Sequence, residues 1–476
     1  MSKRIQPKAP PAVTPQLQEQ IVTQEREYTL ITPLFGGGAI AGERDEVTVV
    51  RGTEIRGHLR FWWRACYGGR YNTVKEMKQD EDRIWGAAAH SKKDEKERAD
   101  AEQKKGKEGE KPRETTVQIT VETLNEGEPI GPFKIKPATR KANSKKGEQR
   151  DQKNGEENWD DEYNPASKVP EYAAFPLQLT SNERKQEERP ESKLVYDNVS
   201  FILTISFPQT RQKEIAGTLW AWETFGGIGA RTRRGFGAIK LKKAILIEQE
   251  TRRRIQIEHV LPIATAKDVR DWLTRKFSDF GIEKKAPGGV PSLSKDMLEE
   301  HIYIMPSFSS PQGAWKALID KLHTFRQPAK GRNKQWPDTK EIRRLRNTQN
   351  ASPQQRYKFP KAVLGLPIAF HFADKGKDAD LTLQGAKEGH DRLASALILR
   401  PLACRNNQVG LALLLENHVE NHTFSPGTLQ VVTKEQKEIP ATIETRLSFA
   451  EARDTVLRGE TDVWKAFMKH LRGNNR

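Results

Sequence analysis

Polar and apolar residues alternate in several short segments of the first half of the chain. An alternation with a period of two is the pattern of a strand that buries one face. It is clearest at 199–207, where every second residue from Val199 to Phe207 is apolar. The same pattern predicts strands at 27–32 and 116–121, and 237–247 is interpreted as a closing strand.

Two segments between these strands have the spacing of helices instead. The segment 211–225 is helical in pattern and ends at two glycines, a common helix stop. In 53–66, apolar residues recur along one helix face and are expected in the core. These residues are Ile55, Leu59, Trp62 and Cys66. Arginines of the same segment fall on a different face and are expected to point outward.

The predicted order of the first half is strand, helix, strand, strand, helix, strand, which is the order of a ferredoxin-like split βαβ fold. The second half has helical patterns at 315–325 and 463–471. Its predicted strands are 362–372, 396–403 and 409–415, the last two forming a hairpin. The fold class is therefore α+β, with one unit at 26–250 and a second at 251–476.

Residues 1–25 are interpreted as a disordered arm, because they contain four prolines and lack the apolar segment of a signal peptide. Two polar insertions, near 90–113 and at 139–164, contain too few apolar residues to bury a core and are also interpreted as disordered. Within the first insertion, residues 92–113 carry nine basic and seven acidic side chains, which nearly cancel. The positive excess of the chain therefore lies on its folded parts.

The net charge of the 476-residue chain is +17, which indicates a polyanionic partner. Two cysteines in a chain of this length exclude a disulfide framework and a Cys-rich zinc module, and they suit a reducing cytoplasm. No run of 18 apolar residues is present, so no transmembrane helix and no membrane partner are expected.

The strongest local excess of charge is at 321–361, where twelve lysines and arginines stand against two acidic residues. Basic side chains neutralise phosphates, and interleaved aromatic rings such as Trp336 and Tyr357 can stack on unpaired bases. A solvated basic helix and loop is the alternative. The residues of this segment assigned to RNA binding are Lys330, Arg332, Lys334, Trp336, Arg343, Arg344 and Arg346.

The most specific motif is a glycine-rich loop at 227–237, with the sequence GIGARTRRGFG. Glycines allow a backbone to approach a ligand closely, and exposed N–H groups with arginines can form a phosphate-binding concavity. A structural turn is the alternative. The loop residues assigned to RNA binding are Gly227, Gly229, Arg231, Arg233, Arg234, Gly235 and Gly237.

This loop resembles the glycine-rich loop of the RAMP superfamily, the RNA-binding proteins of CRISPR systems. The segment 51–65 narrows the resemblance, because RGTEIRGHLRFWWRA is similar to a segment of the Cmr-one RAMP subunit of type III-B (Cmr) effector complexes. The tryptophan pair Trp62-Trp63 makes that match specific. The resemblance covers roughly 28–247, and a weaker one is found at 392–401.

The resemblance implies two RRM-like (ferredoxin-like) RAMP domains in tandem and a non-catalytic subunit without a cofactor. Its expected partners are CRISPR guide RNA, target RNA and other Cmr RAMP subunits. Basic residues of the 51–65 segment are also assigned to RNA binding: Arg51, Arg56, Arg60 and Arg64.

Catalytic motifs are incomplete. Gly37–Gly42 has P-loop spacing but lacks the following lysine, and 418–422 reads H-x-E-x-H rather than H-E-x-x-H. Neither a metal site nor a catalytic residue is therefore assigned. One alternative stays open: His58 lies where some RAMP relatives keep a histidine general acid or base, so the chain could be a metal-independent endoribonuclease that processes CRISPR RNA.

Overall fold

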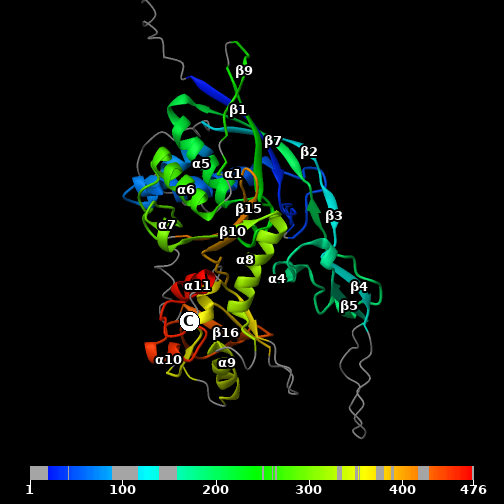
Figure 1. Ribbon diagram of the computed structural model, residues 1–476. Coiled ribbons are helices and arrows are strands. Elements are labelled where there is room, and N and C mark those ends of the chain that lie inside the picture. Colours follow the sequence, from blue (N-terminus) through cyan, green and yellow to red (C-terminus); the bar gives the residue numbers. More distant parts are fainter. Residues whose placement is uncertain are drawn as a thin grey trace, which may run out of the picture.

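The computed structural model describes residues 20–40, 42–87, 116–138, 158–248, 251–259, 261–262, 265–329, 335–348, 352, 354–370, 380–386, 391–415 and 428–473. Two larger sheets with their helices form the body of the molecule, and two smaller parts extend from it (Figure 1). The insertion predicted near 90–113 lies outside the described residues.

The first sheet is antiparallel and has the strand order β2-β7-β1-β8-β9. Its strands are β1 (Ile21–Leu30), β2 (Gln118–Asn125), β7 (Ser200–Pro208), β8 (Ile239–Ile247) and β9 (Arg254–Gln256). The four predicted strands are confirmed. The arm predicted for 1–25 is wrong for 21–25, because these residues pair with β7 as part of β1.

Two helices pack on one face of this sheet, namely α1 (Gly52–Tyr67) and α5 (Gln212–Phe225). A third helix, α6 (Ala266–Phe280), packs against α5. The predicted core face of α1 is confirmed, since Trp62 is 2% exposed. The Cys66 thiol lies in the same core, where burial raises its pKa.

The chain order β1-α1-β2-β7-α5-β8 and the sheet order of these strands match the split βαβ arrangement predicted for the first half. The long connection between β2 and β7 builds a separate arm (Figure 1). Its elements are β3 (Glu128–Ile130), β4 (Phe133–Pro137), β5 (Trp159–Tyr163), α4 (Glu171–Ala174) and β6 (Val195–Asp197). Because β5 pairs with β4, interpreting all of 139–164 as disordered is wrong for 159–163.

The second large sheet is antiparallel, with the order β10-β15-β14. Its strands are β10 (Ile302–Phe308), β14 (Leu397–Ala403) and β15 (Gln408–Leu414), and its helices are α8 (Pro311–Arg326) and α11 (Val463–Arg472). The predicted helices and the β14-β15 hairpin are confirmed. Because the described residues give this sheet three strands rather than four, a second ferredoxin-like domain stays a prediction.

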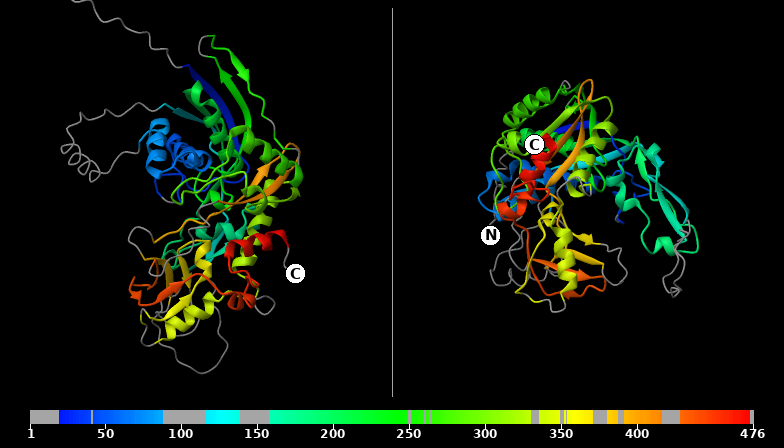
Figure 2. Two further views of the ribbon diagram at one scale, coloured as in Figure 1. Left: turned by 90° about the vertical axis from the view of Figure 1, so that its left-hand side faces the viewer. Right: turned by 60° about the horizontal axis from the view of Figure 1, so that its bottom comes forward.

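A lower part extends from this sheet in a different direction from the arm, as the right-hand view of Figure 2 shows. It contains a sheet in the order β12-β13-β16-β17, a parallel pair β11-β18, and the helix α9 (Asp338–Asn347). The strands are β11 (Arg356–Lys358), β12 (Ile368–Phe370), β13 (Leu381–Gly385), β16 (Leu429–Thr433), β17 (Glu438–Ile439) and β18 (Thr442–Glu444).

The strand predicted at 362–372 is wrong for most of its length. A 3-10 helix occupies Pro360–Leu364, and only Ile368–Phe370 is extended and paired. Proline at the first position favours such a turn, because its fixed φ suits a helical start. The other α-helices of the described residues are α2 (Val74–Trp85), α7 (Met297–Glu300) and α10 (Phe449–Arg453).

The two halves are joined by a buried arginine of β14. Arg400 is 1% exposed, and its guanidinium donates to the carbonyl oxygens of Glu223 at 2.9 Å, Gly226 at 2.5 Å and Ile239 at 2.9 Å. Burial lowers the pKa of Arg400 to about 9, so the side chain is still charged at neutral pH. The guanidinium thereby satisfies carbonyls at the end of α5, where a helix leaves its acceptors free.

Candidate nucleic-acid interface

The glycine-rich loop folds back on its own chain. The Ile228 amide donates to the Gly237 carbonyl oxygen at 3.0 Å, and the Ala230 amide donates to Phe35 at 2.6 Å. A Cβ at Gly237 would lie 1.8 Å from the carbonyl oxygen of Ile228, and its φ is +58°. Glycine is therefore required at 237 for this close packing of backbone against backbone.

Two of the three loop arginines bind the second half of the chain. Arg233 donates to the carbonyl oxygen of Ser395, and Arg234 donates to that of Leu397 at 2.9 Å. The Trp315 indole returns a hydrogen bond to the Arg234 carbonyl at 2.6 Å. Burial lowers the pKa of Arg234 to about 9. The loop thus caps the edge of β14, and of its three arginines only Arg231 is exposed.

The arginines of α1 do not point into solvent, contrary to the prediction. Arg56 donates to the carbonyl oxygens of Trp85 at 2.8 Å and Val117 at 3.2 Å. Arg60 binds Glu81 at 2.7 Å and is 16% exposed, and Arg64 also binds Glu81. Helix α2 supplies the buried carboxylate that attracts them. The acidic residues of 74–85 can be read from the sequence, but their proximity to α1 cannot.

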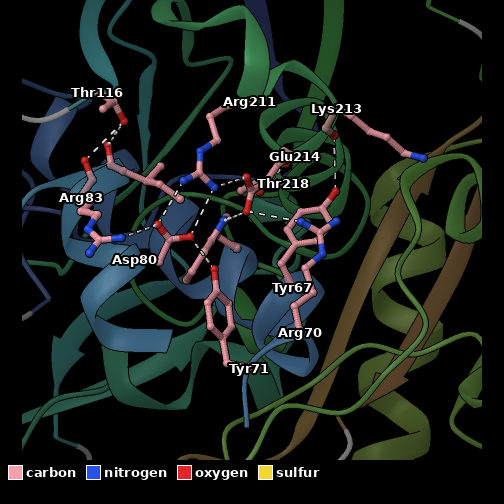
Figure 3. Close-up of polar contacts among 12 residues, drawn as sticks. Tyr67, Arg70, Tyr71, Asp80, Arg83, Thr116, Arg211, Lys213, Glu214 and Thr218 are labelled. Atoms are coloured by element: carbon pink, nitrogen blue, oxygen red, sulfur yellow. Dashed lines mark hydrogen bonds and ion pairs between the residues drawn. The ribbon is translucent and has the colours of Figure 1, made fainter. Parts of the chain in front are cut away.

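A second polar cluster on the same helices was missed by the sequence interpretation (Figure 3). Arg211 lies between the carboxylates of Asp80, at 3.0 Å, and Glu214, at 2.9 Å. Tyr71 donates to Asp80 at 2.5 Å, and the Trp63 indole donates to Glu214 at 2.7 Å. The cluster ties α2 to α1 and α5, so Trp63 has a polar as well as an apolar role.

A pocket of about 250 Å³ opens beside the glycine-rich loop. It lies where the middle of the loop, α1, the end of α5 and β14 meet. Its walls are largely aromatic, and its polar groups come from α1 and the loop. The lining includes His58, Phe61, Trp62, Phe225, Thr232 and Arg233.

His58 is half-buried and forms a pair with Glu54 on the same face of α1. The distance from Nε2 to Glu54 Oε1 is 3.4 Å, and the side chains are 25% and 15% exposed. The same Glu54 oxygen accepts from the Gly229 amide, so this carboxylate holds the first glycine pair of the loop. The other oxygen of Glu54 is buried and has no hydrogen-bond partner among the described residues.

The RAMP superfamily model matches residues 27–240 of the chain. This part of the chain is similar to the RAMP superfamily. The match includes the end of β1, strands β2 and β7, the start of β8, helices α1 and α5, the arm and the whole glycine-rich loop.

No curated protein matches the chain. Among solved structures, Cmr1 from Pyrococcus furiosus in its apo form is 16% identical, with 83% of this chain and 87% of that chain covered and a TM-score of 0.43. A chain of the type III-B Cmr-beta complex bound to cognate target RNA and AMPPnP in the presence of ssDNA is 11% identical, with 96% and 100% covered and a TM-score of 0.46.

Helix α9 lies outside the segment that the RAMP superfamily model matches and carries an exposed basic face. Lys340, Arg343, Arg344 and Asn347 are exposed and spaced at i, i+3, i+4 and i+7, so they share one side of the helix. Ile342 and Leu345 are buried on the other side. Arg344 pairs with Glu341 at 2.6 Å, whereas Lys340 and Arg343 have no acidic partner among the described residues.

The aromatic residues of this basic segment do not offer stacking faces, which corrects the prediction for Trp336 and Tyr357. Trp336 is 3% exposed, and its indole donates to the Phe325 carbonyl at 2.8 Å. Tyr357 is 2% exposed and lies under the Arg344 guanidinium. Both rings are buried in the hydrophobic core of this region instead. Three further predicted residues lie outside the described part of the chain: Lys330, Arg332 and Lys334.

The remaining predicted residues are half-buried or buried. Arg51 is half-buried before α1, and Arg346 is half-buried on α9. Gly227 and Gly235 are buried within the glycine-rich loop. Within the described ranges, no group of three His, Cys, Asp or Glu side chains could hold a metal ion, and no helix is long and apolar enough to cross a membrane.

Proposed function

We propose that the chain is a non-catalytic, RNA-binding subunit of a type III-B CRISPR ribonucleoprotein complex, in which it binds guide or target RNA in antiviral defence. The RAMP superfamily match at 27–240 supports the superfamily. The resemblance of the 51–65 segment, with Trp62-Trp63, supports the type III-B complex. Other RAMP subunits of that complex are its proposed protein partners.

The observation that carries RNA binding is the exposed basic face of α9. Lys340 and Arg343 are exposed without an acidic partner among the described residues, in a chain of net charge +17. A cation that is already paired inside a protein gains little free energy from a phosphate. An unpaired exposed cation that binds a phosphate displaces counterions condensed on the nucleic acid, and their release favours binding. The α9 face therefore provides phosphate contacts that need no rearrangement of the fold.

The test removes these two charges. Lys340→Ala/Arg343→Ala should weaken binding of a single-stranded RNA and lower the slope of log K against log salt by about 1.4, because each neutralised phosphate contributes roughly 0.7. The matched control is Lys75→Ala/Arg83→Ala, which removes the same charge from exposed positions of α2. Equal salt slopes for the two double variants would reject α9 as the RNA contact.

A second candidate, a metal-independent endoribonuclease, is favoured by one observation. His58 and Arg233 line the same pocket, which brings a possible proton carrier near a cation that could stabilise a phosphorane. Incubation of the purified chain with CRISPR repeat RNA in EDTA separates the two functions. The non-catalytic proposal expects no defined cut, and a cut that His58→Ala abolishes would establish the nuclease instead.

A further inference from the structure

Three cations from distant parts of the sequence come together where the glycine-rich loop, the end of α8 and the 3-10 helix Pro360–Leu364 approach one another. They are Arg231, Arg326 and Lys361, and we call them the cationic junction. We propose that the cationic junction binds backbone phosphates of the RNA, with Arg326 at its centre. The inference rests on the proposed RNA binding and extends it from α9 to a second site, to which both halves of the chain contribute.

Helix α8 positions the central cation. Arg326 is its last residue and lies three positions after His323, so the two side chains share one side of the helix. The His323 ring stacks on Tyr172 of α4 at a centroid distance of 4.6 Å. Figure 1 shows α4 beside α8, and the two helices are in contact. The side of α8 that carries Arg326 therefore faces the arm.

The glycine-rich loop brings Arg231 to the same place. The preceding residue, Ala230, packs against the same hydrophobic core as Tyr172. Arg231 has a φ of +57°, in the left-handed region that an arginine rarely adopts. A strained residue of this kind persists only where the surrounding structure holds it, and such residues are concentrated at binding and catalytic sites.

The lower part of the molecule supplies Lys361. Its ammonium nitrogen lies 5.4 Å from the centre of the Trp336 ring, and the Trp336 indole donates to the Phe325 carbonyl oxygen at 2.8 Å. Phe325 directly precedes Arg326 at the end of α8. The tryptophan thus places the lysine beside the central arginine.

The cations of the junction are close enough to act on one another. Desolvation lowers the pKa of Arg231, and the positive charge of Arg326 lowers it further. Burial also lowers the pKa of Lys361, and Arg326 acts on it in the same direction. Within the described part of the chain, none of the three side chains forms an ion pair or a hydrogen bond. An anion bound between them would relieve this repulsion.

One carboxyl group also acts on the junction, but it neutralises the charge only in part. Asp338 Oδ1 accepts from the backbone amide of Lys361 at 3.2 Å, and Oδ2 is buried without a hydrogen-bond partner among the described residues. Because burial raises the pKa of Asp338 to about 7, this carboxyl is only partly ionised at neutral pH. The balance of charge is therefore positive. A phosphodiester has two free oxygens and can accept from two of the cations at once.

The position of the junction favours an RNA strand over a small free anion. Asp338 is the first residue of α9, so its bond to Lys361 joins the junction to the helix that carries Lys340 and Arg343. The cations therefore extend from the glycine-rich loop to α9. A free phosphate would use only one part of such a surface, whereas a strand with one phosphate per nucleotide can contact all of it.

The experiment measures binding of a labelled, unstructured single-stranded RNA to the full-length chain at several salt concentrations. Arg326→Ala should weaken binding at least about tenfold, the value for one hydrogen bond to a charged group. It should also lower the slope of log K against log salt by about 0.7, the value for one phosphate on a single strand. Arg275→Ala, which removes an exposed arginine from α6, is the matched control and should change neither quantity.

Thermal unfolding separates a binding role of Arg326 from a structural one. Because its side chain has no partner among the described residues, Arg326→Ala should leave the melting temperature unchanged or raise it, while RNA binding falls. A lower melting temperature together with unchanged RNA affinity would overturn the inference. If Arg326→Ala does not fold, Lys361→Ala takes its place and should lower the salt slope by the same amount, about 0.7.

Inorganic phosphate serves as the second ligand and distinguishes the two sources of phosphate. Stabilisation by inorganic phosphate that depends on Arg326, with normal RNA binding by Arg326→Ala, would make the junction a small-anion site and reject the RNA assignment. RNA binding that is weakened in Lys340→Ala/Arg343→Ala but normal in Arg326→Ala would keep the proposed function and reject only this inference. An unchanged chain that binds no RNA would reject both.

Discussion

The glycine-rich loop and helix α9 are similar in sequence, since each places three arginines within a few residues, but the fold uses them differently. In the loop, Arg233 and Arg234 donate to carbonyl oxygens of Ser395 and Leu397, more than 160 positions away. On α9, Arg344 is likewise held, by Glu341 and by the carbonyl oxygen of Arg356 in β11, but Lys340 and Arg343 stay exposed. We therefore expect an arginine to be available to an anion only where no backbone carbonyl of another element already accepts from it.

The same rule applies to Arg400, and its substitution is expected to lower stability more than any other change considered. Arg400→Met should lower the free energy of unfolding by about 3–5 kcal/mol, because it leaves several buried carbonyl oxygens of the first half without a donor. Denaturant unfolding measures the change. Arg392→Met, at an arginine that is 83% exposed, is the control and should cost less than about 0.5 kcal/mol. Equal losses for the two variants would show that the two halves do not depend on this buried guanidinium.

Arg60 tests the internal use of arginine on α1. Arg60→Ala should cost about 2 kcal/mol, since it removes one of two guanidinium partners from Glu81, which is only 1% exposed. Arg83→Ala, 56% exposed on α2, provides the comparison and should be nearly neutral. Thermal unfolding of both variants decides the matter. If Arg60→Ala is as harmless as Arg83→Ala, the Glu81 pair contributes nothing to stability.

Local periodicity predicted the parts of the fold that depend on nearest neighbours in sequence. Alternation at 199–207 gave β7, and the i, i+4, i+7 spacing gave the core face of α1 with Trp62. The arm was not predicted, because strands of three to five residues such as β3 carry too few alternations to stand out. The distant partners of Arg233 and Arg234, and the burial of Trp336, depend on which elements meet in space, and no local pattern records this.

The pocket could be predicted only in part for the same reason. The resemblance drew attention to His58, and the glycine motif to Arg233, but nothing in the sequence places Phe225 and Ile398 beside them. Gly226 was interpreted as a helix stop, which it is. Its second effect, the close approach of its backbone to the Trp62 indole, depends on the packing of α1 against α5 and is visible only in the structure.

Helix α9 contrasts with the loop in a second way, because a buried acid lies at its first residue. Asp338 is 0% exposed, and burial raises its pKa to about 7. The folded state therefore holds a proton that the unfolded state loses near its ordinary pKa of 3.8. This contribution to stability is complete below pH 4 and is lost as the pH rises through 7.

Asp338→Asn should remove that pH dependence and raise stability at pH 8 by on the order of 1 kcal/mol, since an amide carries no charge to bury. Unfolding midpoints at pH 5 and pH 8 measure it. Asp279→Asn, 59% exposed on α6, is the control. An unchanged difference between the two pH values in Asp338→Asn would assign the pH dependence to other groups.

The smallest effect distinguishes the arginines within the glycine-rich loop itself. Arg231 is exposed and can reach a phosphate, whereas Arg234 is bound to Leu397. Arg231→Ala should therefore lower the salt slope of RNA binding by about 0.7, the value for one phosphate on a single strand, with little change in stability. Arg234→Ala should do the opposite: it should destabilise the fold by about 1–2 kcal/mol through the lost carbonyl partner and leave the salt slope unchanged. Both slopes are measured on the same RNA, in buffers where each variant is fully folded. A lower slope for Arg234→Ala would mean that the loop releases β14 to bind RNA, and the contrast between the loop and α9 would then hold only for the free protein.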